Sequence, residues 1–282
     1  MKAGNITQKH RFKLEIPVGK GRYAVFSLPT NNQYQFIDDI KIEPNCFKNI
    51  ITSKERNRVV VFTLNDVEKK IIIKFNTKTQ TYKKTVDERF SLDDYEKIKI
   101  PEADRFVNGA DAQIKTIVRK IINHEKNIKA IFTSLYQFIL RYLTYGQPID
   151  GLHTYKQALE EKVTDCGGFS TLLMSLLHSL NIPSHLVVGF IIKDNFLAEI
   201  FFPLTFNSLL MHVWVEAMLP DKSWFPLDPA IEWRRRKGLT QRQGGFGYIP
   251  ADRLVVSYGQ NFTININNRK YQIELLQKPA YI

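Results

Sequence analysis

Residues 164–169 read Thr164-Asp165-Cys166-Gly167-Gly168-Phe169, and this stretch decides the predicted fold. It opens a helix whose apolar residues recur on one face: Phe169, Leu172, Leu173, Leu176, Leu177 and Leu180. Cys166 therefore falls in the first helical turn, where backbone N–H groups lack intrahelical partners and the helix dipole favours negative charge. We expect a lowered pKa and a more reactive thiolate for a thiol in this position.

The two glycines after the cysteine favour access of a substrate. Because Gly167 and Gly168 have no side chains, a carbonyl group could approach the backbone closely. A simpler interpretation is a buried free cysteine that fills core space, preceded by Asp165 as a plain helix cap. Taken alone, the motif favours the simpler interpretation.

Two later segments supply the partners that a nucleophilic thiol needs. The stretch from His212 to Ala217 alternates as a strand, with His212, Trp214 and Glu216 on one face. The stretch Trp224-Phe-Pro-Leu-Asp228-Pro is a short strand that ends in a carboxylate, and a hairpin through 220–223 would bring Asp228 beside His212. Cys, His and Asp in three elements meet the requirement for a nucleophile, a base and an orienting group. Each alone has a simpler role, as a structural histidine or a turn residue before proline.

The chain is predicted to have two domains. Its first 80 residues contain short strands separated by Pro, Gly and Asn turns, at 12–16, 23–28, 35–42, 58–64 and 70–75. This spacing suggests an antiparallel β-sandwich. A helical pattern then covers 104–145, and strands return from 184 onward. We therefore predict an accessory β-sandwich domain over 1–100 and an α+β domain over 101–282.

Composition limits the class of protein and its partners. A hydrophobic fraction of 44% and a charged fraction of 24% exclude a disordered or fibrous chain. The formal net charge is +12, and residues 1–100 hold 20 basic and 12 acidic residues. This excess suggests a polyanionic partner, an acidic substrate or an anionic surface without choosing among them, and an anionic polymer that binds the basic N-terminal domain is one such partner. The sequence has no apolar run typical of a signal peptide or a membrane span, so we expect a cytoplasmic protein with no membrane partner. It indicates no oligomeric state.

Four motifs, in this order, resemble the bacterial branch of the transglutaminase-like superfamily, which has a papain-type Cys-His-Asp site. The motifs are Asp165-Cys-Gly-Gly-Phe-Ser170, Leu180-Asn-Ile-Pro-Ser-His-Leu-Val-Val-Gly189, His212-Val-Trp-Val-Glu216 and Trp224-Phe-Pro-Leu-Asp228-Pro229. The resemblance covers roughly 101–259. It implies a helix that carries the cysteine and packs on an antiparallel sheet, and the N-terminal domain is similar to the sandwich that often precedes this core in bacterial members.

The resemblance also implies roles for single residues. Cys166 would be the nucleophile, His212 the general base and Asp228 the residue that orients the imidazole. The Cys166 backbone N–H would be one oxyanion donor. Animal transglutaminases use a tryptophan upstream of the cysteine, which this sequence lacks; Tyr145 is our candidate for the second donor, and Trp214 for a wall of the site. No acidic cluster matches their calcium sites, so we predict no metal and no cofactor.

The predicted function is thiol-dependent acyl transfer on peptide or glutamine amides of a protein or peptide substrate, through a thioester on the cysteine. Water is always available, so hydrolysis is preferred, as in a cysteine protease, amidase or deamidase. If an amine resolves the thioester, the activity is a protein-glutamine γ-glutamyltransferase that crosslinks proteins. A third alternative is a non-catalytic binding protein on the same fold.

Four smaller features have mostly structural interpretations. Residues 232–237, which contain four basic residues, are expected to form a solvated loop rather than a site for an acidic ligand. Residues 243–247, which are rich in glycine, are expected to form a flexible flap. Residues 195–207 are an aromatic-rich insertion that either lines a substrate groove or covers the core. Cys46 has no nearby His or Cys and is expected to be structural.

Overall fold

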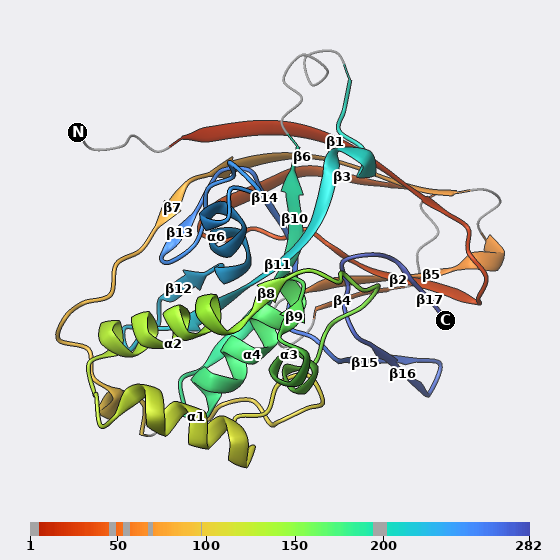
Figure 1. Ribbon diagram of the computed structural model, residues 1–282. Coiled ribbons are helices and arrows are strands. Elements are labelled where there is room, and N and C mark those ends of the chain that lie inside the picture. The colour runs from red at the N-terminus through yellow and green to blue at the C-terminus, as the bar shows by residue number, and fades with distance from the viewer. Residues whose placement is uncertain (1–5, 45–48, 53–56, 67–69, 97, 194–201) are drawn as a thin grey trace. The chain divides into compact units, whose positions relative to one another are not determined.

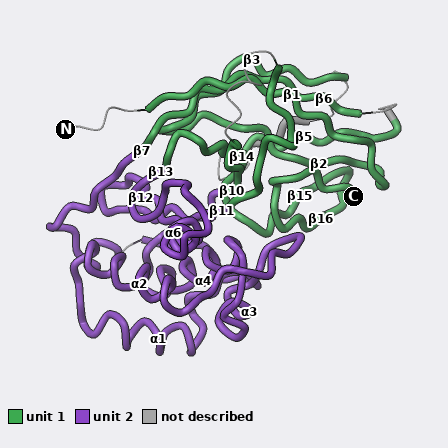
Figure 2. The backbone as a smooth tube through the Cα atoms, turned by 45° about the horizontal axis from the view of Figure 1, so that its top comes forward, with its two compact units in different colours: residues 1–82, 188–212, 250–282 green, residues 83–187, 213–249 purple. Residues whose placement is uncertain are grey.

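The computed structural model describes residues 6–44, 49–52, 57–66, 70–96, 98–193 and 202–282 (Figure 1). The chain forms two compact units, each assembled from separate segments (Figure 2). Unit 1 contains residues 1–82, 188–212 and 250–282, and unit 2 contains 83–187 and 213–249. The limits of these units are set by contacts between residues and do not coincide with the boundary predicted at residue 100. That domain boundary stays a prediction. Cys46 lies outside the described residues.

The first sheet of unit 1 has the strand order β1-β6-β3 and is antiparallel, with bounds β1 Thr7–Pro17, β6 Lys70–Gln80 and β3 Gln35–Glu43. Burial alternates along β1: Phe12, Leu14 and Ile16 are buried, whereas the residues between them carry charges and face outward. Phe12 stacks on Phe75 of β6. One face of this sheet therefore belongs to the core and the other is exposed.

The second sheet of unit 1 has the order β17-β2-β5-β4, with bounds β2 Tyr23–Leu28, β5 Arg58–Thr63, β4 Asn49–Thr52 and β17 Ala280–Tyr281. Every residue of β2 is buried, as expected for a central strand. A hairpin packs against β2 and β5, formed by β15 Phe262–Ile266 and β16 Arg269–Ile273. The predicted β-rich N-terminal region is confirmed, but its second sheet also takes a strand from the C-terminus.

The helices lie in unit 2 and pack around one buried helix. Their bounds are α1 Ala112–Ile122, α2 Ile128–Tyr142, α3 Tyr155–Glu161, α4 Cys166–His178 and α6 Pro229–Arg236. All residues of α4 after the cysteine are buried, and the other four helices contact it. A helix that is buried on all sides needs apolar or small residues around its whole circumference, and α4 has them. The predicted α+β class, with a helix that begins at the cysteine, is confirmed.

A four-stranded sheet of order β12-β11-β10-β14 contains the strands that bear the other motifs. Its bounds are β10 Ser184–Ile192, β11 Leu209–Met218, β12 Trp224–Leu227 and β14 Arg253–Tyr258. β11 and β12 form the predicted antiparallel hairpin, with Val215 opposite Leu227. β10 and β11 each run from one unit into the other, and the change of unit on β11 falls after His212.

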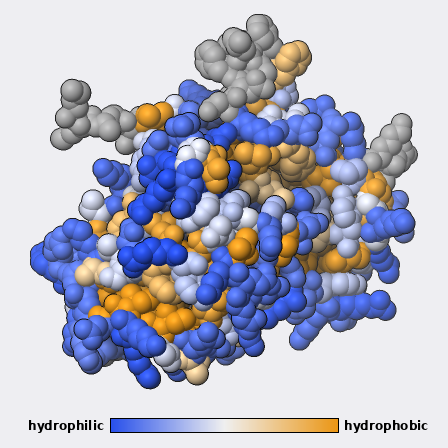
Figure 3. Space-filling view, in the orientation of Figure 1, coloured by the Kyte–Doolittle hydropathy of each residue, from blue (hydrophilic) through white to orange (hydrophobic). Residues whose placement is uncertain are grey.

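Short elements connect these parts. They are the 3₁₀ turns η1 Leu64–Asp66, η2 Leu92–Tyr95 and η3 Phe206–Ser208 and the two-residue strands β7 Tyr82–Lys83, β8 Thr144–Tyr145, β9 Val163–Thr164 and β13 Tyr248–Ile249. Hydrophilic side chains cover much of the face in Figure 3, and hydrophobic ones gather between them in patches. Among the described residues, no helix has the length and apolarity needed to cross a membrane. The cellular compartment stays a prediction.

Two local predictions were wrong. Residues 232–237 do not form a solvated loop, because Pro229–Arg236 form helix α6 with Asp228 as its N-cap. The helical pattern that was predicted up to residue 145 ends earlier, since α2 ends at Tyr142 and Tyr145 lies on β8, paired with Thr164 of β9. That pairing places Tyr145 close in space to the start of α4.

Candidate functional site

Asp165 is the N-cap of helix α4 and is buried. One of its carboxylate oxygens accepts a hydrogen bond from the Gly167 backbone N–H at 2.8 Å, and the other accepts one from the Ile149 N–H at 3.3 Å. The carboxylate thus satisfies a donor that the helix leaves free and also fixes the preceding loop. This arrangement sets the position of Cys166, the first residue of the helix.

The two glycines after the cysteine serve packing, which corrects the expectation that they leave room for a substrate. A Cβ atom on Gly168 would lie 2.0 Å from Thr164 Oγ1, inside its van der Waals radius. A Cβ atom on Gly167 would lie 3.0 Å from both Asp165 Oδ1 and Leu152 Cδ1. Both glycines are buried, so their small size lets the β9–α4 turn close tightly.

Cys166 is half-buried as a residue, and the pKa of its thiol differs from the expectation. Burial of the sulfur raises the pKa of Cys166 to about 12, and the negative charge of Asp165 raises it further. A backbone hydrogen bond from Val213 and one from Cys166 itself lower it, but not enough to compensate. The predicted lowering of the pKa by the helix N-terminus is therefore wrong, and the resting thiol is protonated at neutral pH.

The contact with Val213 shows where strand β11 passes. Val213 lies next to the Cys166 sulfur, and its neighbour along the strand is His212. His212 is buried, and its carbonyl oxygen accepts a hydrogen bond from Gln277 Nε2 at 3.1 Å. Gln277 also donates to the carbonyl oxygen of Gly189 on β10. This side chain joins β10 to β11 at the backbone of the predicted base, and the sequence gave no sign of it because Gln277 belongs to no motif.

Asp228 is fully buried at the N-terminus of α6. Its Oδ1 accepts the Ile231 backbone N–H at 3.2 Å, which makes it a helix cap. Asp228 follows Leu227, the last residue of β12, and Leu227 pairs with Val215 of β11, three residues beyond His212. The negative charge of Asp228 also raises the pKa of Cys166, so the two side chains lie within electrostatic reach of each other.

Hydrogen bonds hold the Asp228 peptide on both sides. Its N–H donates to the carbonyl oxygen of Gly245 at 3.1 Å, and its carbonyl oxygen accepts from the Tyr136 hydroxyl at 3.0 Å. The same hydroxyl lies 2.8 Å from Glu232 Oε2. The pair Tyr136 and Glu232 was not predicted, because partners that are 96 residues apart leave no local pattern.

The glycine-rich segment is packed rather than free, which corrects the predicted flap. Phe246 contacts the rings of Tyr136 and Phe225 edge to face, and the Gly247 N–H donates to the Pro226 carbonyl at 2.8 Å. Gly245 has a φ of +134°, and a Cβ atom there would lie 2.6 Å from Glu232 Oε2. Glycine is therefore required at 245 so that the segment can bond to Asp228.

Tyr145 lies beside the cysteine. Burial raises the pKa of Tyr145 to about 12, and the charge of Cys166 contributes to the increase. The Arg234 guanidinium stands 4.8 Å from the centre of the tyrosine ring and lowers the same pKa. The phenol remains protonated, and hence a hydrogen-bond donor, throughout the physiological pH range. The proximity agrees with the predicted donor role, but no contact with an oxyanion tests it.

The remaining predicted residues have these positions. Trp214 is fully buried on β11, and its role as a wall of the site stays a prediction. Lys237 lies over the Trp233 ring at 5.7 Å, and Arg236 forms an ion pair with Glu232, so the basic run is attached to its own helix. Phe196 and Phe201 of the aromatic insertion lie outside the described residues. Within the described ranges, no group of three or more His, Cys, Asp or Glu is placed to hold a metal ion.

Comparisons with known proteins show which family and which folds the chain is similar to. Residues 115–229 match the sequence model of the Transglutaminase-like superfamily, a segment that includes Cys166, His212 and Asp228. No curated protein matches the chain. A candidate cysteine protease from Cytophaga hutchinsonii is similar in structure, with 14% identity, a TM-score of 0.55, and coverage of 90% of this chain and 83% of that one. The periplasmic domain of TgpA from Pseudomonas aeruginosa has 13% identity, a TM-score of 0.41, and coverage of 77% and 72%.

Proposed function

Because residues 115–229 match the Transglutaminase-like superfamily, we propose that this protein is an enzyme that transfers acyl groups through Cys166. The observation that carries the proposal is the surroundings of the thiol at the start of α4. The sulfur is buried in a residue that is itself only half-buried, receives a backbone hydrogen bond from the residue after His212, and lies in the field of Asp228. We assign Cys166 as the nucleophile, His212 as the base and Asp228 as the residue that orients the imidazole.

The raised pKa of the thiol determines how the reaction would begin. With a pKa of about 12, Cys166 holds its proton at rest, so the sulfur attacks the amide carbon while His212 accepts the proton. The attack forms a C–S bond and places negative charge on the carbonyl oxygen. The backbone N–H of Cys166 and the hydroxyl of Tyr145 are the donors that we assign to this oxygen, where one lost donor typically costs about 3 kcal/mol of barrier.

The remaining steps return the enzyme to its starting state. The C–N bond breaks as His212 gives its proton to the leaving amine, which leaves a thioester on Cys166. Water then attacks the thioester and gives a proton to His212, and the sulfur recovers that proton as the acid is released. We therefore propose hydrolysis of peptide or glutamine amides. An amine in place of water would give a crosslink, which is the alternative outcome of the same chemistry.

Comparing the active protein with its Cys166→Ala variant in a cell lysate tests the proposal. We expect new peptide termini, or glutamines converted to glutamate, only with the active protein. Lys–Gln crosslinks in place of these products would identify a γ-glutamyltransferase. His212→Ala is the second variant, and it should abolish the same products. If the unsubstituted protein gives no products that are missing with the two variants, the chain is a binding protein on a transglutaminase fold.

The exposed face of the β1-β6-β3 sheet supports a second proposal, that unit 1 binds an anionic polymer. At one end of this face, lysines are neutralised: Lys13 and Lys70 pair with Glu15, and Lys74 pairs with Glu43. At the other end, Lys9 and Lys78 lie directly opposite each other and form no ion pair within the described part of the chain.

Like charges opposite each other in a sheet are destabilising, and a polyanion would relieve their repulsion. These lysines border a hollow of about 650 Å³ that also exposes Phe36 and Phe202, which are 48% and 70% exposed. Replacing Lys9 and Lys78 by glutamate should abolish retention on a heparin column at low salt, whereas Lys41→Glu, at a lysine that already pairs with Asp39, should change it little. A wild-type protein that passes through unretained would refute this proposal.

A further inference from the structure

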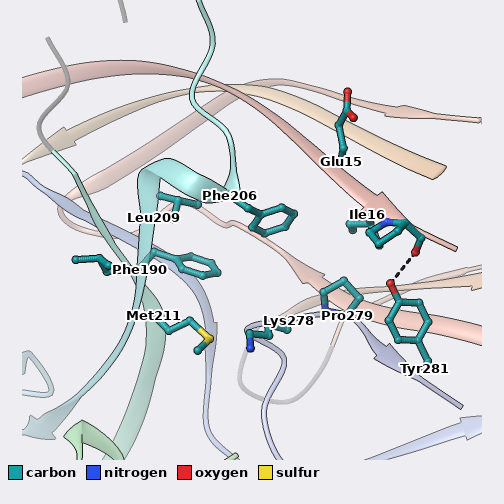
Figure 4. A pocket seen from close by; sticks show the side chains of 11 residues that line it. Glu15, Ile16, Phe190, Phe206, Leu209, Met211, Lys278, Pro279 and Tyr281 are labelled. Atoms are coloured by element: carbon teal, nitrogen blue, oxygen red, sulfur yellow. Dashed lines mark hydrogen bonds between the residues drawn. The ribbon is translucent and has the colours of Figure 1, made fainter. Parts of the chain in front are cut away.

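Unit 1 contains two hollows of similar volume whose linings differ. The hollow in Figure 4, of about 550 Å³, has mostly apolar walls, and at one end the Tyr281 hydroxyl donates to the Pro17 carbonyl oxygen at 2.7 Å. Its phenylalanines, Phe190 and Phe206, are buried or half-buried. The hollow of about 650 Å³ on the exposed face of the β1-β6-β3 sheet is lined instead by charged side chains and exposed aromatic rings. This second hollow therefore offers contacts to a ligand that combines charge with flat rings.

The pairing of the strands sets the order of the side chains across the second hollow. Lys9 of β1 lies opposite Lys78 of β6, and Lys78 lies opposite Phe36 of β3. Paired residues of adjacent strands point to the same face of a sheet, and adjacent strands are about 4.8 Å apart, so these three residues form a row about 10 Å long. All three are exposed.

A second exposed ring lies beyond the β1 end of this row. The backbone of Leu204 is attached to the outer edge of β1, where its N–H donates to the Arg11 carbonyl oxygen at 2.7 Å. Phe202, two residues earlier, lines the same hollow as Phe36. Since β1 is the edge strand and β3 is the opposite edge, the two rings stand on opposite sides of the hollow with the two lysines between them.

The exposure of these rings sets them apart from the other aromatic side chains. Phe36 and Phe202 keep 48% and 70% of their surface exposed. Of the large apolar side chains that are exposed in the described part of the chain, these two are the aromatic ones, and both line this hollow. Apolar groups that gather at one exposed place mark binding surfaces.

The charges of the hollow favour an anionic ligand. Its lining has three residues with a full positive charge, Lys9, Arg11 and Lys78, against one acidic residue, Asp38. Lys9 and Lys78 form no ion pair within the described part of the chain, so their charges are available to a ligand. The hollow thus presents ammonium groups in the middle and aromatic faces at both sides.

We infer that the anionic polymer bound by unit 1 is a single-stranded nucleic acid, with bases stacked on Phe36 and Phe202 and phosphates on Lys9 and Lys78. Proteins that bind single strands combine a basic groove for the backbone with aromatic side chains on which bases stack. A sulfated sugar chain or a polyphosphate would pair with the lysines, but it has no aromatic ring to stack on the phenylalanines. The inference rests on the proposal that unit 1 binds an anionic polymer, and it goes further by naming the polymer.

Fluorescence anisotropy with a labelled oligothymidylate of about 12 nucleotides, a length within the range of single-strand sites, tests the inference on the full chain. Phe36→Leu keeps an apolar side chain but removes the ring, and it should weaken binding about tenfold because one base loses its stacking partner. Phe36→Tyr keeps the ring and should bind like the wild type. Neither substitution should change retention on heparin, which has no bases.

The lysines are tested by the dependence of binding on salt. The slope of log affinity against log salt concentration should fall by about 1.4 when Lys9 and Lys78 are both replaced by Gln, since each phosphate contact to a single strand contributes about 0.7. Lys41→Gln, at a lysine of the same sheet that pairs with Asp39, should leave the slope unchanged. A duplex of the same length should bind less tightly, because its bases are stacked on each other and cannot stack on protein rings.

Equal binding of the oligothymidylate by the wild type and Phe36→Leu, or equal binding of duplex and single strand, would overturn the inference. If retention on heparin still depends on Lys9 and Lys78 in that case, the proposal of an anionic polymer stands and the partner is one without bases. A wild-type protein that binds neither heparin nor the oligothymidylate would reject both proposals.

Discussion

Helices α4 and α6 begin in the same way, yet we assign different roles to their capping residues. Each helix follows a buried aspartate whose side chain accepts a backbone N–H: Asp165 from Gly167, and Asp228 from Ile231. The negative charges of both raise the pKa of Cys166. Capping geometry and burial alone therefore cannot distinguish a structural aspartate from one that orients a base.

The surroundings of the two residues do differ. The second oxygen of Asp165 accepts the Ile149 N–H, so its side chain is used by the local backbone. The side chain of Asp228 accepts the Ile231 N–H, and its backbone is held by Gly245 on one side and Tyr136 on the other. A residue that orients another side chain needs this kind of fixed backbone. Matched substitutions at Asp165 and Asp228 test whether the two residues have different roles.

The largest expected effect is on turnover. Asp228→Asn should lower kcat by on the order of 10⁴-fold, because the amide would favour the wrong imidazole tautomer. Asp165→Asn should lower it less than tenfold. Asparagine caps helices as well as aspartate, so the melting temperatures should stay close to that of the wild type. The measurement is kcat on a substrate identified from the lysate, and equal losses at both positions would contradict the division of roles.

The second effect concerns the two glycines that follow the Asp165 cap, Gly167 and Gly168. Gly168→Ala should destabilise the fold by about 3 kcal/mol or more, because its Cβ would lie 2.0 Å from Thr164 Oγ1 and overpack the turn. Gly167→Ala meets atoms only at 3.0 Å and should cost less. Urea unfolding measures both, and adding Thr164→Ala to Gly168→Ala should recover part of the loss. If Gly168→Ala were as stable as the wild type, the β9–α4 turn would have to shift at little cost to make room for the added methyl group.

A smaller effect is expected from removing the caps themselves. Asp165→Ala and Asp228→Ala should each lower the free energy of unfolding by about 1 kcal/mol, within the usual range for a lost N-cap. Asp165→Ala also leaves the Ile149 N–H without its acceptor, so it should be the more destabilising of the two. The same urea measurements check this order. A reversed order would mean that the side chain of Asp228 contributes more to the fold than its cap.

The sequence could predict features that depend on residues close together along the chain, and it could not predict those that depend on residues far apart. Helix α4, strand β10 and the β11–β12 hairpin are dictated by local periodicity and turns, and they were predicted within a few residues. Helix α6 was missed because its three consecutive arginines resemble a solvated segment, while the Asp-Pro pair that starts it was interpreted as a turn. The supports of the site were also missed, since Gln277 and Tyr136 act on His212 and Asp228 across long stretches of chain. The raised pKa of Cys166 was missed because burial, which only the tertiary structure sets, outweighs the helix dipole.

The last prediction compares how the negative charges of Asp165 and Asp228 affect the reactivity of the Cys166 thiol. With a pKa of about 12, the Cys166 thiolate fraction at pH 7 is small, so the rate of alkylation by iodoacetamide should rise about tenfold per pH unit up to pH 10 without a plateau. Removing a negative charge lowers a thiol pKa, so both asparagine variants should react faster than the wild type at a given pH. The increase should be larger for Asp165→Asn, because the charge of Asp165 raises the pKa more than that of Asp228 does. In His212→Ala, where no imidazole can accept the proton, the rate at pH 7 should fall below that of the wild type. A plateau near pH 8.5 in all four proteins, as for an exposed cysteine, would mean that neither burial nor the aspartates control this thiol.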